Sequence, residues 1–241
     1  MRQFLAAASA LALIAAATPT RATLMIAADF GGTIFNCSDN QASCDTDPAV
    51  GSLQIANQSI GGVQVNGSIQ TSTKTAGAPQ ILNTSSLSVI NNNTTTTAII
   101  VTIGDTDFNG PVNSFNTSGS GVFQQAVGSS ATLNWFDDPN NAQGATSPTT
   151  TPGTMIDMFS KTATVVADSF SHNGSGPVND PGLFSMTEQV VGSLIAGGQL
   201  LNRGQTEIKN PVVIPEPASL AILAIGLIGT WLVRRRYPRH S

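Results

Sequence analysis

Apolar and polar residues alternate along much of the chain between residues 23 and 210, which is the pattern of β-strands with one buried face. In 52–59 the apolar positions are Leu53 and Ile55, and in 62–71 they are Val63 and Val65. Strands are expected at 52–59, 62–71, 94–103, 121–127, 131–136, 162–170, 183–194 and 199–208. The segment 183–201 also fits a helix, and that alternative stays open.

Turn-forming residues separate these segments. The region is rich in Ser, Thr, Asn and Gly, and it contains few Glu, Lys and Arg. β-branched residues favour strands, whereas Asn, Gly and Pro favour turns. The pattern predicts an all-β, antiparallel β-sandwich-like domain, with a solenoid as the weaker alternative. Ala196, Gly197 and Gly198 are expected to form the turn of the last hairpin, and 137–153 and 172–182 to form exposed loops.

Residues 1–22 have the features of a secretory signal peptide. Arg2 supplies a positive charge, residues 4–17 are apolar, and Thr20-Arg21-Ala22 offers a cleavage site after Ala22. The apolar stretch is too short to favour an uncleaved anchor. We therefore expect export through the Sec translocon and removal of 1–22 by signal peptidase.

Residues 211–241 combine three features in a fixed order. Pro215, Glu216 and Pro217 precede an uncharged apolar segment, 218–233, which a basic cluster follows at Arg234, Arg235 and Arg236. As a helix the apolar segment spans roughly 24 Å, slightly less than the bilayer core of about 30 Å. The arginines act as a membrane stop on the cytoplasmic side. A transmembrane helix at 218–233 is the expected structure, and a buried core helix is the alternative.

This tripartite segment resembles the PEP-CTERM sorting signal of Gram-negative bacteria. The resemblance rests on Pro215, Glu216 and Pro217 with Ala218 and Ser219, then the apolar segment, then the arginines. It covers about an eighth of the chain. It implies recognition and cleavage near Pro-Glu-Pro by the membrane protease-transpeptidase exosortase. It also implies release or transfer of the body to the cell surface, often in species that make exopolysaccharide. The tail after the arginines is slightly longer than the family's usual one.

The charge of the exported part excludes one class of partner. Residues 23–210 contain eleven Asp and two Glu against four bases, Lys74, Lys161, Arg203 and Lys209. Nucleic-acid binding requires clustered Lys and Arg. No nucleic-acid partner is therefore expected, whereas acidity favours solubility and cation binding.

Cys37 and Cys44 are the chain's two cysteines, and both lie in the exported part. Export places them in an oxidising compartment. The intervening Ser38-Asp39-Asn40-Gln41 favours a turn that brings the two thiols together. The sequence predicts a Cys37–Cys44 disulfide.

Residues 105–110 match the first half of a calcium-binding loop, with Asp105, Asp107 and Asn109 as candidate ligands and Gly110 for the turn. The twelfth position is Asn116 and not the bidentate Glu of that pattern, and a strand precedes the segment. The segment is thus either a calcium site or a strand that ends in an Asp/Asn/Gly turn. Calcium is the one cofactor that the sequence suggests.

Two further residues suggest binding or catalysis. Trp135 is either a sugar-stacking ring beside Phe136 or a core aromatic at a strand end. His172 lies near Asp168, Ser169, Ser171 and Asp180 in sequence, but a catalytic triad needs a shaped site. No enzymatic activity is expected.

The sequence therefore divides into a signal peptide (1–22), a β-rich exported domain (23–210) and a sorting segment (211–241). The expected protein is first anchored in the inner membrane and then lies at the cell surface or outside the cell. Its expected role is structural, in association with exopolysaccharide or a biofilm matrix. A calcium- or carbohydrate-binding surface module is the alternative, and a secreted hydrolase is a third.

Overall fold

The computed structural model describes residues 23–210 and contains thirteen β-strands. The expected signal peptide and the sorting segment, with its helix at 218–233, lie outside the described residues. Within 23–210 no helix has the length and apolar character needed to cross a membrane. The strands are β1 (Met25–Phe30), β2 (Thr33–Ser38), β3 (Ser52–Ile55), β4 (Gln58–Ile60), β5 (Val63–Thr73), β6 (Gln80–Asn91), β7 (Thr97–Asn109), β8 (Val112–Gln124), β9 (Ser130–Asp138), β10 (Thr154–Thr162), β11 (Ala167–Asp180), β12 (Leu183–Leu194) and β13 (Gln199–Lys209).

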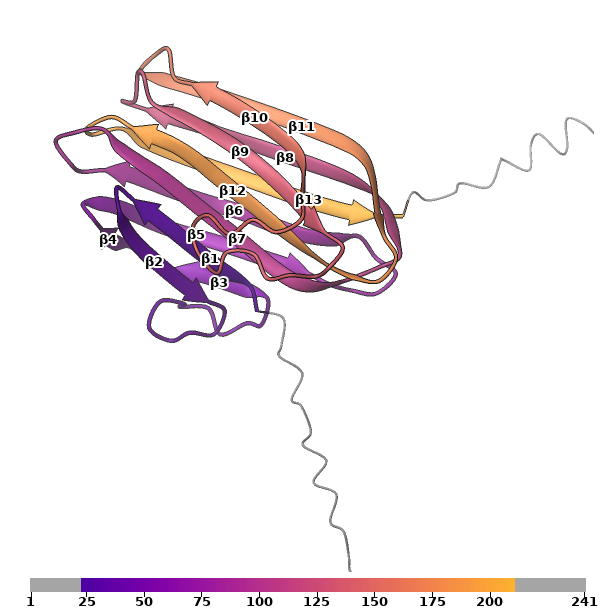
Figure 1. Ribbon diagram of the computed structural model, residues 1–241. Coiled ribbons are helices and arrows are strands. Elements are labelled where there is room, and N and C mark those ends of the chain that lie inside the picture. The colour runs from indigo at the N-terminus through magenta and orange to yellow at the C-terminus, as the bar shows by residue number, and fades with distance from the viewer. Residues whose placement is uncertain (1–22, 211–241) are drawn as a thin grey trace, which may run out of the picture.

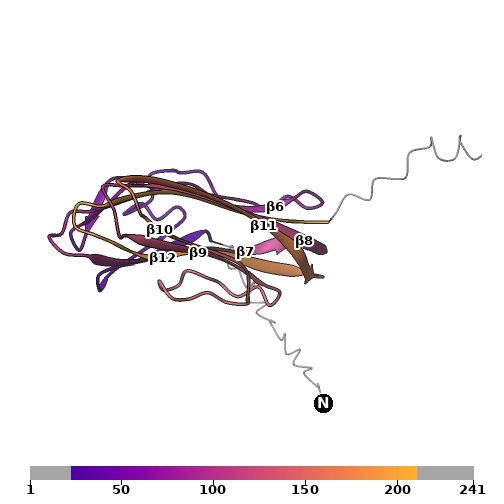
Figure 2. The ribbon, with the colours of Figure 1, turned by 90° about the horizontal axis from the view of Figure 1, so that it is seen from above.

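Two antiparallel sheets pack face to face, as Figures 1 and 2 show. The first, here called sheet A, has the strand order β10-β9-β12-β7-β1-β2. The second, sheet B, has the order β11-β8-β13-β6-β5-β3, and β4 also pairs with β5. The predicted all-β sandwich is therefore confirmed.

From β6 onward most connections cross between the sheets. Consecutive strands β6, β7, β8 and β9 alternate between sheet B and sheet A, and so do β10, β11, β12 and β13. The Gly197 turn was expected to close a hairpin of paired strands. It instead joins β12 in sheet A to β13 in sheet B, so its position was predicted correctly but not its role. The alternative helix at 183–201 is not formed, because β12 and β13 occupy that stretch.

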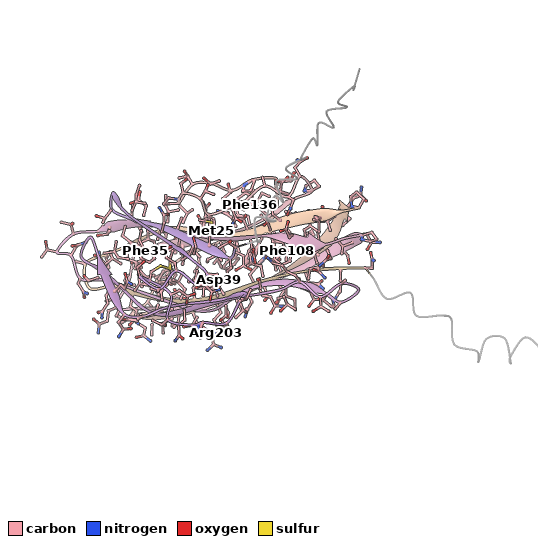
Figure 3. All side chains as sticks on the ribbon, turned by 90° about the horizontal axis from the view of Figure 1, so that it is seen from below. Met25, Phe35, Asp39, Phe108, Phe136 and Arg203 are labelled. Carbon is pink, nitrogen blue, oxygen red and sulfur yellow. A yellow bond between two sulfur atoms is a disulfide. The ribbon has the colours of Figure 1, made fainter. Side chains whose placement is uncertain are left out.

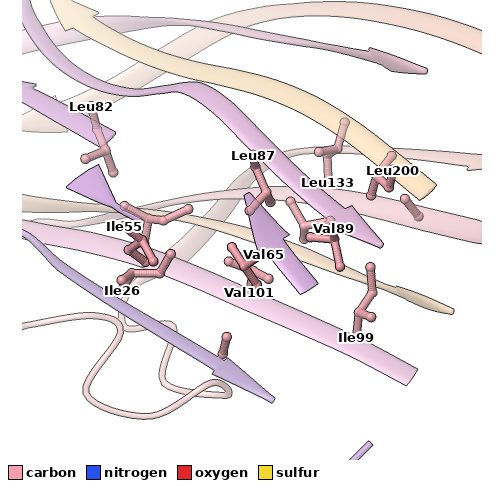
Figure 4. Close-up of a cluster of buried hydrophobic side chains, with 14 of the residues drawn as sticks. Ile26, Ile55, Val65, Leu82, Leu87, Val89, Ile99, Val101, Leu133 and Leu200 are labelled. Atoms are coloured by element: carbon pink, nitrogen blue, oxygen red, sulfur yellow. The ribbon is translucent and has the colours of Figure 1, made fainter. Parts of the chain in front are cut away.

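The inner faces of the two sheets form one hydrophobic core, part of which Figure 4 shows. Leu87 and Val89 of β6 face the core from sheet B, and Ile99 and Val101 of β7 from sheet A; each is at most 1% exposed. The core residues lie between Leu24 and Ile208. The described segment thus contains its own apolar core, which is the main stabilising feature of a sandwich.

Of the two segments expected to be exposed loops, 172–182 is mostly strand, whereas 139–153 is a loop that is only partly exposed. The segment 172–182 was expected to be a loop because of its Gly, Asn and Pro residues, but β11 continues to Asp180 by pairing with β8. The segment 139–153 lies against the outer face of sheet A, where Thr102 and Gln189 donate to the Pro148 carbonyl at 2.5 and 3.1 Å. Ala145 in the same segment is fully buried.

Glu188 is a buried acid inside this core. It lies on the inner face of β12, and its carboxylate accepts hydrogen bonds of 3.0 Å from Thr84 on β6 and from Thr206 on β13. Burial raises the pKa of Glu188 from 4.5 to about 7, although the two threonines favour the charged form. At a pH between 4.5 and 7, Glu188 therefore stays protonated in the folded protein but is ionised in the unfolded chain. The free energy of unfolding therefore falls as pH rises from 4.5 to 7.

The substitution Glu188→Gln should remove the free-energy cost of ionising a buried carboxyl group and keep the contacts with the two threonines. At about pH 8 the variant should be more stable than the wild type by up to about 3 kcal/mol, and at about pH 4 the two should be similar. Urea unfolding at both pH values measures the difference, with Glu207→Gln on the outer face of β13 as control. A Glu188→Gln effect that is the same at both pH values would contradict this account.

Candidate functional site

The predicted disulfide is confirmed. Cys37 on β2 and Cys44 in the following turn are joined with an S–S distance of 2.00 Å, and both are buried. Carboxylates near the disulfide accept hydrogen bonds from backbone amides of the same segment. Asp39 accepts from the Gly51 amide at 2.7 Å, and Asp45 accepts from the Asn40 amide at 2.8 Å. These acids therefore order the turns around the disulfide.

The candidate calcium ligands lie on the last part of β7, and each has a protein partner. Asp105 is fully buried and pairs with Lys74 at 2.7 Å. Asp107 accepts from Asn141 at 2.6 Å, and the Asn109 amide donates to the Lys74 carbonyl at 2.8 Å. In residues 23–210 no group of three or more His, Cys, Asp or Glu side chains is arranged to hold a metal. A cation at Asp105 would compete with the Lys74 ammonium for the carboxylate.

Trp135 lies in the core, as the core alternative expected. It is 1% exposed, on the inner face of β9. Its ring stacks on His172 at a centroid distance of 5.7 Å, and a Cβ on Gly119 would approach it to 3.0 Å. Because the ring is enclosed, this position does not support the sugar contact considered for Trp135.

His172 belongs to a cluster between the edge strands β10 and β11. Its Nε2 lies 2.9 Å from the Asp157 carboxylate, which also accepts a hydrogen bond from Thr117. The imidazole stacks on Phe159 at 5.0 Å, so Trp135 and Phe159 both pack against it. The cluster links the two sheets where each ends in an edge strand.

The other residues near His172 in sequence do not join it. Ser169 and Ser171 alternate with His172 along β11 and are exposed, whereas Asp168 and His172 point inward. Asp168 pairs with Lys161 at 2.8 Å, and this contact, aided by the Thr164 amide, lowers the pKa of Asp168 to about 2. The serines thus lie on the opposite face of the strand from the imidazole that would activate them.

A buried carboxyl pair was not predicted. Asp137 on β9 and Asp180 on β11 face each other from opposite sheets, and both are at least 94% buried. Three of their oxygens receive no hydrogen bond from another group in the described chain. Burial raises the pKa of both acids, and the Asp180 charge raises that of Asp137 further. A proton shared between the two carboxyls accounts for this arrangement.

The outer face of sheet B carries a line of uncharged polar side chains. Asn173 on β11 pairs in register with Ser118 on β8, and Gln205 on β13 lies between Ser118 and Asn83 of β6. Thr71 on β5 pairs with Asn83 and completes the line. Directly paired residues of antiparallel strands lie on the same face, so these five side chains form one polar row.

The polar row lies between two shallow depressions. One has a volume of about 380 Å³ and is lined by Asn83, Ser118, Asn173, Gln205 and Arg203, among others. The other, about 390 Å³, adjoins Asn116 and again includes Ser118, Asn173 and Gln205. Figure 3 shows Arg203 on the outer side of this layer and Phe136 on the opposite side of the sandwich. Sequence reasoning missed the row because its residues are far apart along the chain.

Comparison with solved structures gives distant similarities of fold. The Arthrobacter globiformis T6 isomalto-dextranase complexed with panose is 14% identical; the match covers 65% of this chain and 23% of that one, with a TM-score of 0.26. For tailspike protein 4 of bacteriophage CBA120 the identity is 12%, the coverages are 61% and 19%, and the TM-score is 0.31. TmCBM61 in complex with β-1,4-galactotriose is 8% identical; the match covers 71% of this chain and 95% of that one, with a TM-score of 0.31. This chain thus spans less than a quarter of the first two proteins.

The sequence comparisons identify the segment that follows the sandwich. No curated protein matches the sequence. The family model of the PEP-CTERM protein-sorting motif matches residues 213–236, which include Pro215, Glu216, Pro217 and the three arginines. Proteins with this motif are exported and sorted to the cell surface. The chain therefore carries a PEP-CTERM protein-sorting motif, which implies an exported protein that exosortase processes.

Proposed function

We propose that this protein is a non-catalytic structural component of the cell surface or extracellular matrix, associated with exopolysaccharide. The observation that carries the proposal is the position of the sorting motif relative to the sandwich. β13 ends at Lys209, and Pro215 follows six residues later, at most about 20 Å away in an extended chain. Cleavage near Pro215–Pro217 leaves every core residue, Leu24 to Ile208, in the released part.

The distribution of charged groups in the sandwich favours a structural role over catalysis. The His172 imidazole is engaged with Asp157 and packed against two aromatic rings, while Ser169 and Ser171 point to the other side of β11. The acids at 39, 45, 105 and 168 bond to backbone amides or to lysines. Polar groups thus serve the fold, and the outer face of sheet B remains for contact with a partner.

The route to the surface completes the proposal. The Sec translocon exports the chain, and signal peptidase removes 1–22. The apolar segment 218–233 then holds the precursor in the inner membrane, with Arg234–Arg236 in the cytoplasm. Exosortase then separates the sandwich from this helix. The protein reaches the matrix as a soluble, acidic, disulfide-bonded domain.

Intact-mass analysis tests the processing. The mature protein from cells with exosortase should begin near Thr23 and end near Pro217, because both terminal segments are removed. A Pro215→Ala/Glu216→Ala/Pro217→Ala variant should keep Arg234–Arg236 and remain in the membrane fraction. If the wild-type protein also retains the arginines in the presence of exosortase, the processing route is wrong.

Fractionation tests the structural role. In polysaccharide-producing cells the processed sandwich should sediment with the extracellular matrix. In otherwise identical cells unable to make polysaccharide, it should pass into the medium. Equal amounts in the medium of both strains would contradict an association with exopolysaccharide, and catalytic turnover of a matrix polymer would contradict the non-catalytic role.

A further inference from the structure

The polar row (Asn173, Ser118, Gln205, Asn83 and Thr71) has the dimensions of an extended binding site. Its members come from five adjacent strands, β11, β8, β13, β6 and β5. Four strand spacings of about 4.8 Å give a length of about 19 Å. Several sugar units of an extended chain match such a length, and the flanking depressions provide room on both sides.

The row has unused hydrogen-bonding capacity. Within residues 23–210, the side chains of Ser118, Asn173 and Gln205 make no hydrogen bond to protein, and Asn83 reaches Thr71 only at 3.4 Å. Amide and hydroxyl side chains both donate and accept. Sugar hydroxyl groups also do both, so the chemistry of the row matches a hydroxyl-rich chain.

The charges on this face favour a neutral ligand. The exported part has thirteen acids against four bases, which disfavours an anionic polymer. Along the row itself all five side chains are uncharged. Glu207, next to the row, forms an ion pair with Lys209. The Arg203 guanidinium, near Ser120 and Ser171, adds hydrogen-bond donors to this face.

An apolar strip lies on the same face. Val122 on β8 pairs in register with Leu201 on β13, four residues along the strands from Ser118 and Gln205. Both line a third depression of about 360 Å³, which Phe170 also lines. The C–H faces of sugar rings are apolar, so this strip complements the polar row.

We propose that the polar row on the outer face of sheet B binds a neutral polysaccharide chain. The proposal rests on the proposed matrix function and assigns the ligand class and surface that serve it. A second copy of the chain is a poorer occupant. Stable protein interfaces bury about 800 Å² per partner around an apolar core, whereas hydroxyl and amide groups occupy the centre of this face.

Affinity electrophoresis tests the proposal. The processed protein is run in native gels that contain dextran, pullulan, galactan or hydroxyethyl cellulose, and in a parallel gel with dextran sulfate. We expect retardation by at least one neutral polymer. The Asn173→Ala/Gln205→Ala variant should bind that polymer about tenfold more weakly, because it lacks two hydrogen-bonding side chains. Neither side chain packs in the core, so the melting temperature should not change.

The matched control changes the same residue types elsewhere. Asn134 lies on the outer face of sheet A. Gln64 on β5 pairs with Ile90 of β6, which is seven residues from Asn83. Asn134→Ala/Gln64→Ala should bind like the wild type. Retardation by dextran sulfate alone, by no neutral polymer, or equally with both variants would overturn the proposal. So would a concentration-dependent dimer that the row variant abolishes.

The two proposals fail in distinguishable ways. If the row variant still sediments with the matrix of polysaccharide-producing cells, the matrix function stands and the assignment of the row is wrong. If the wild type does not sediment with the matrix, the matrix function itself fails.

Discussion

Burial of one face of each sheet against the other is the interaction on which the rest of this structure depends. The two inner faces supply most of the described core, which extends from Leu24 to Ile208. Separation of the two layers would expose this core to water, and most connections after β6 cross between the sheets and tie the layers together. Polar side chains also link the two sheets. Glu188 joins the sheets through Thr84 and Thr206 in the centre, and Asp157 joins them through His172 at the edge.

The outer faces of the two sheets differ from each other. The segment 139–153 covers part of the outer face of sheet A through the Pro148 carbonyl. The corresponding region of sheet B carries short polar side chains, and shallow depressions adjoin them. Lys209 precedes Pro215 by only six residues, so the proposed cleavage near Pro-Glu-Pro would leave both faces unchanged. Fold, processing and contact surface are therefore mutually consistent.

The sequence predicted the parts of this structure that depend on local pattern. Alternation predicted the bounds of β12, Leu183–Leu194, and the spacing of Cys37 and Cys44 predicted the disulfide. β6 escaped prediction because polar residues such as Thr84 and Asn91 occupy inward positions, and β11 escaped because pairing with β8 overrides its Gly and Pro residues.

The polar row was beyond prediction for a different reason. Its members come from positions as distant as Thr71 and Gln205, and only the pairing register of five strands brings them together. The same holds for Asp137 and Asp180, which meet across the sandwich. Periodicity indicates which side chains share a face of one strand, but it does not indicate which strands are neighbours.

The most direct test of the account follows the side-chain amide signals of the processed protein by NMR during titration with a neutral polysaccharide fragment. We expect the signals of Asn173, Gln205 and Asn83 to shift together and saturate, while those of Asn134 and Gln64 stay in place. Shifts confined to other surfaces, or shifts caused only by a charged polymer, would contradict it.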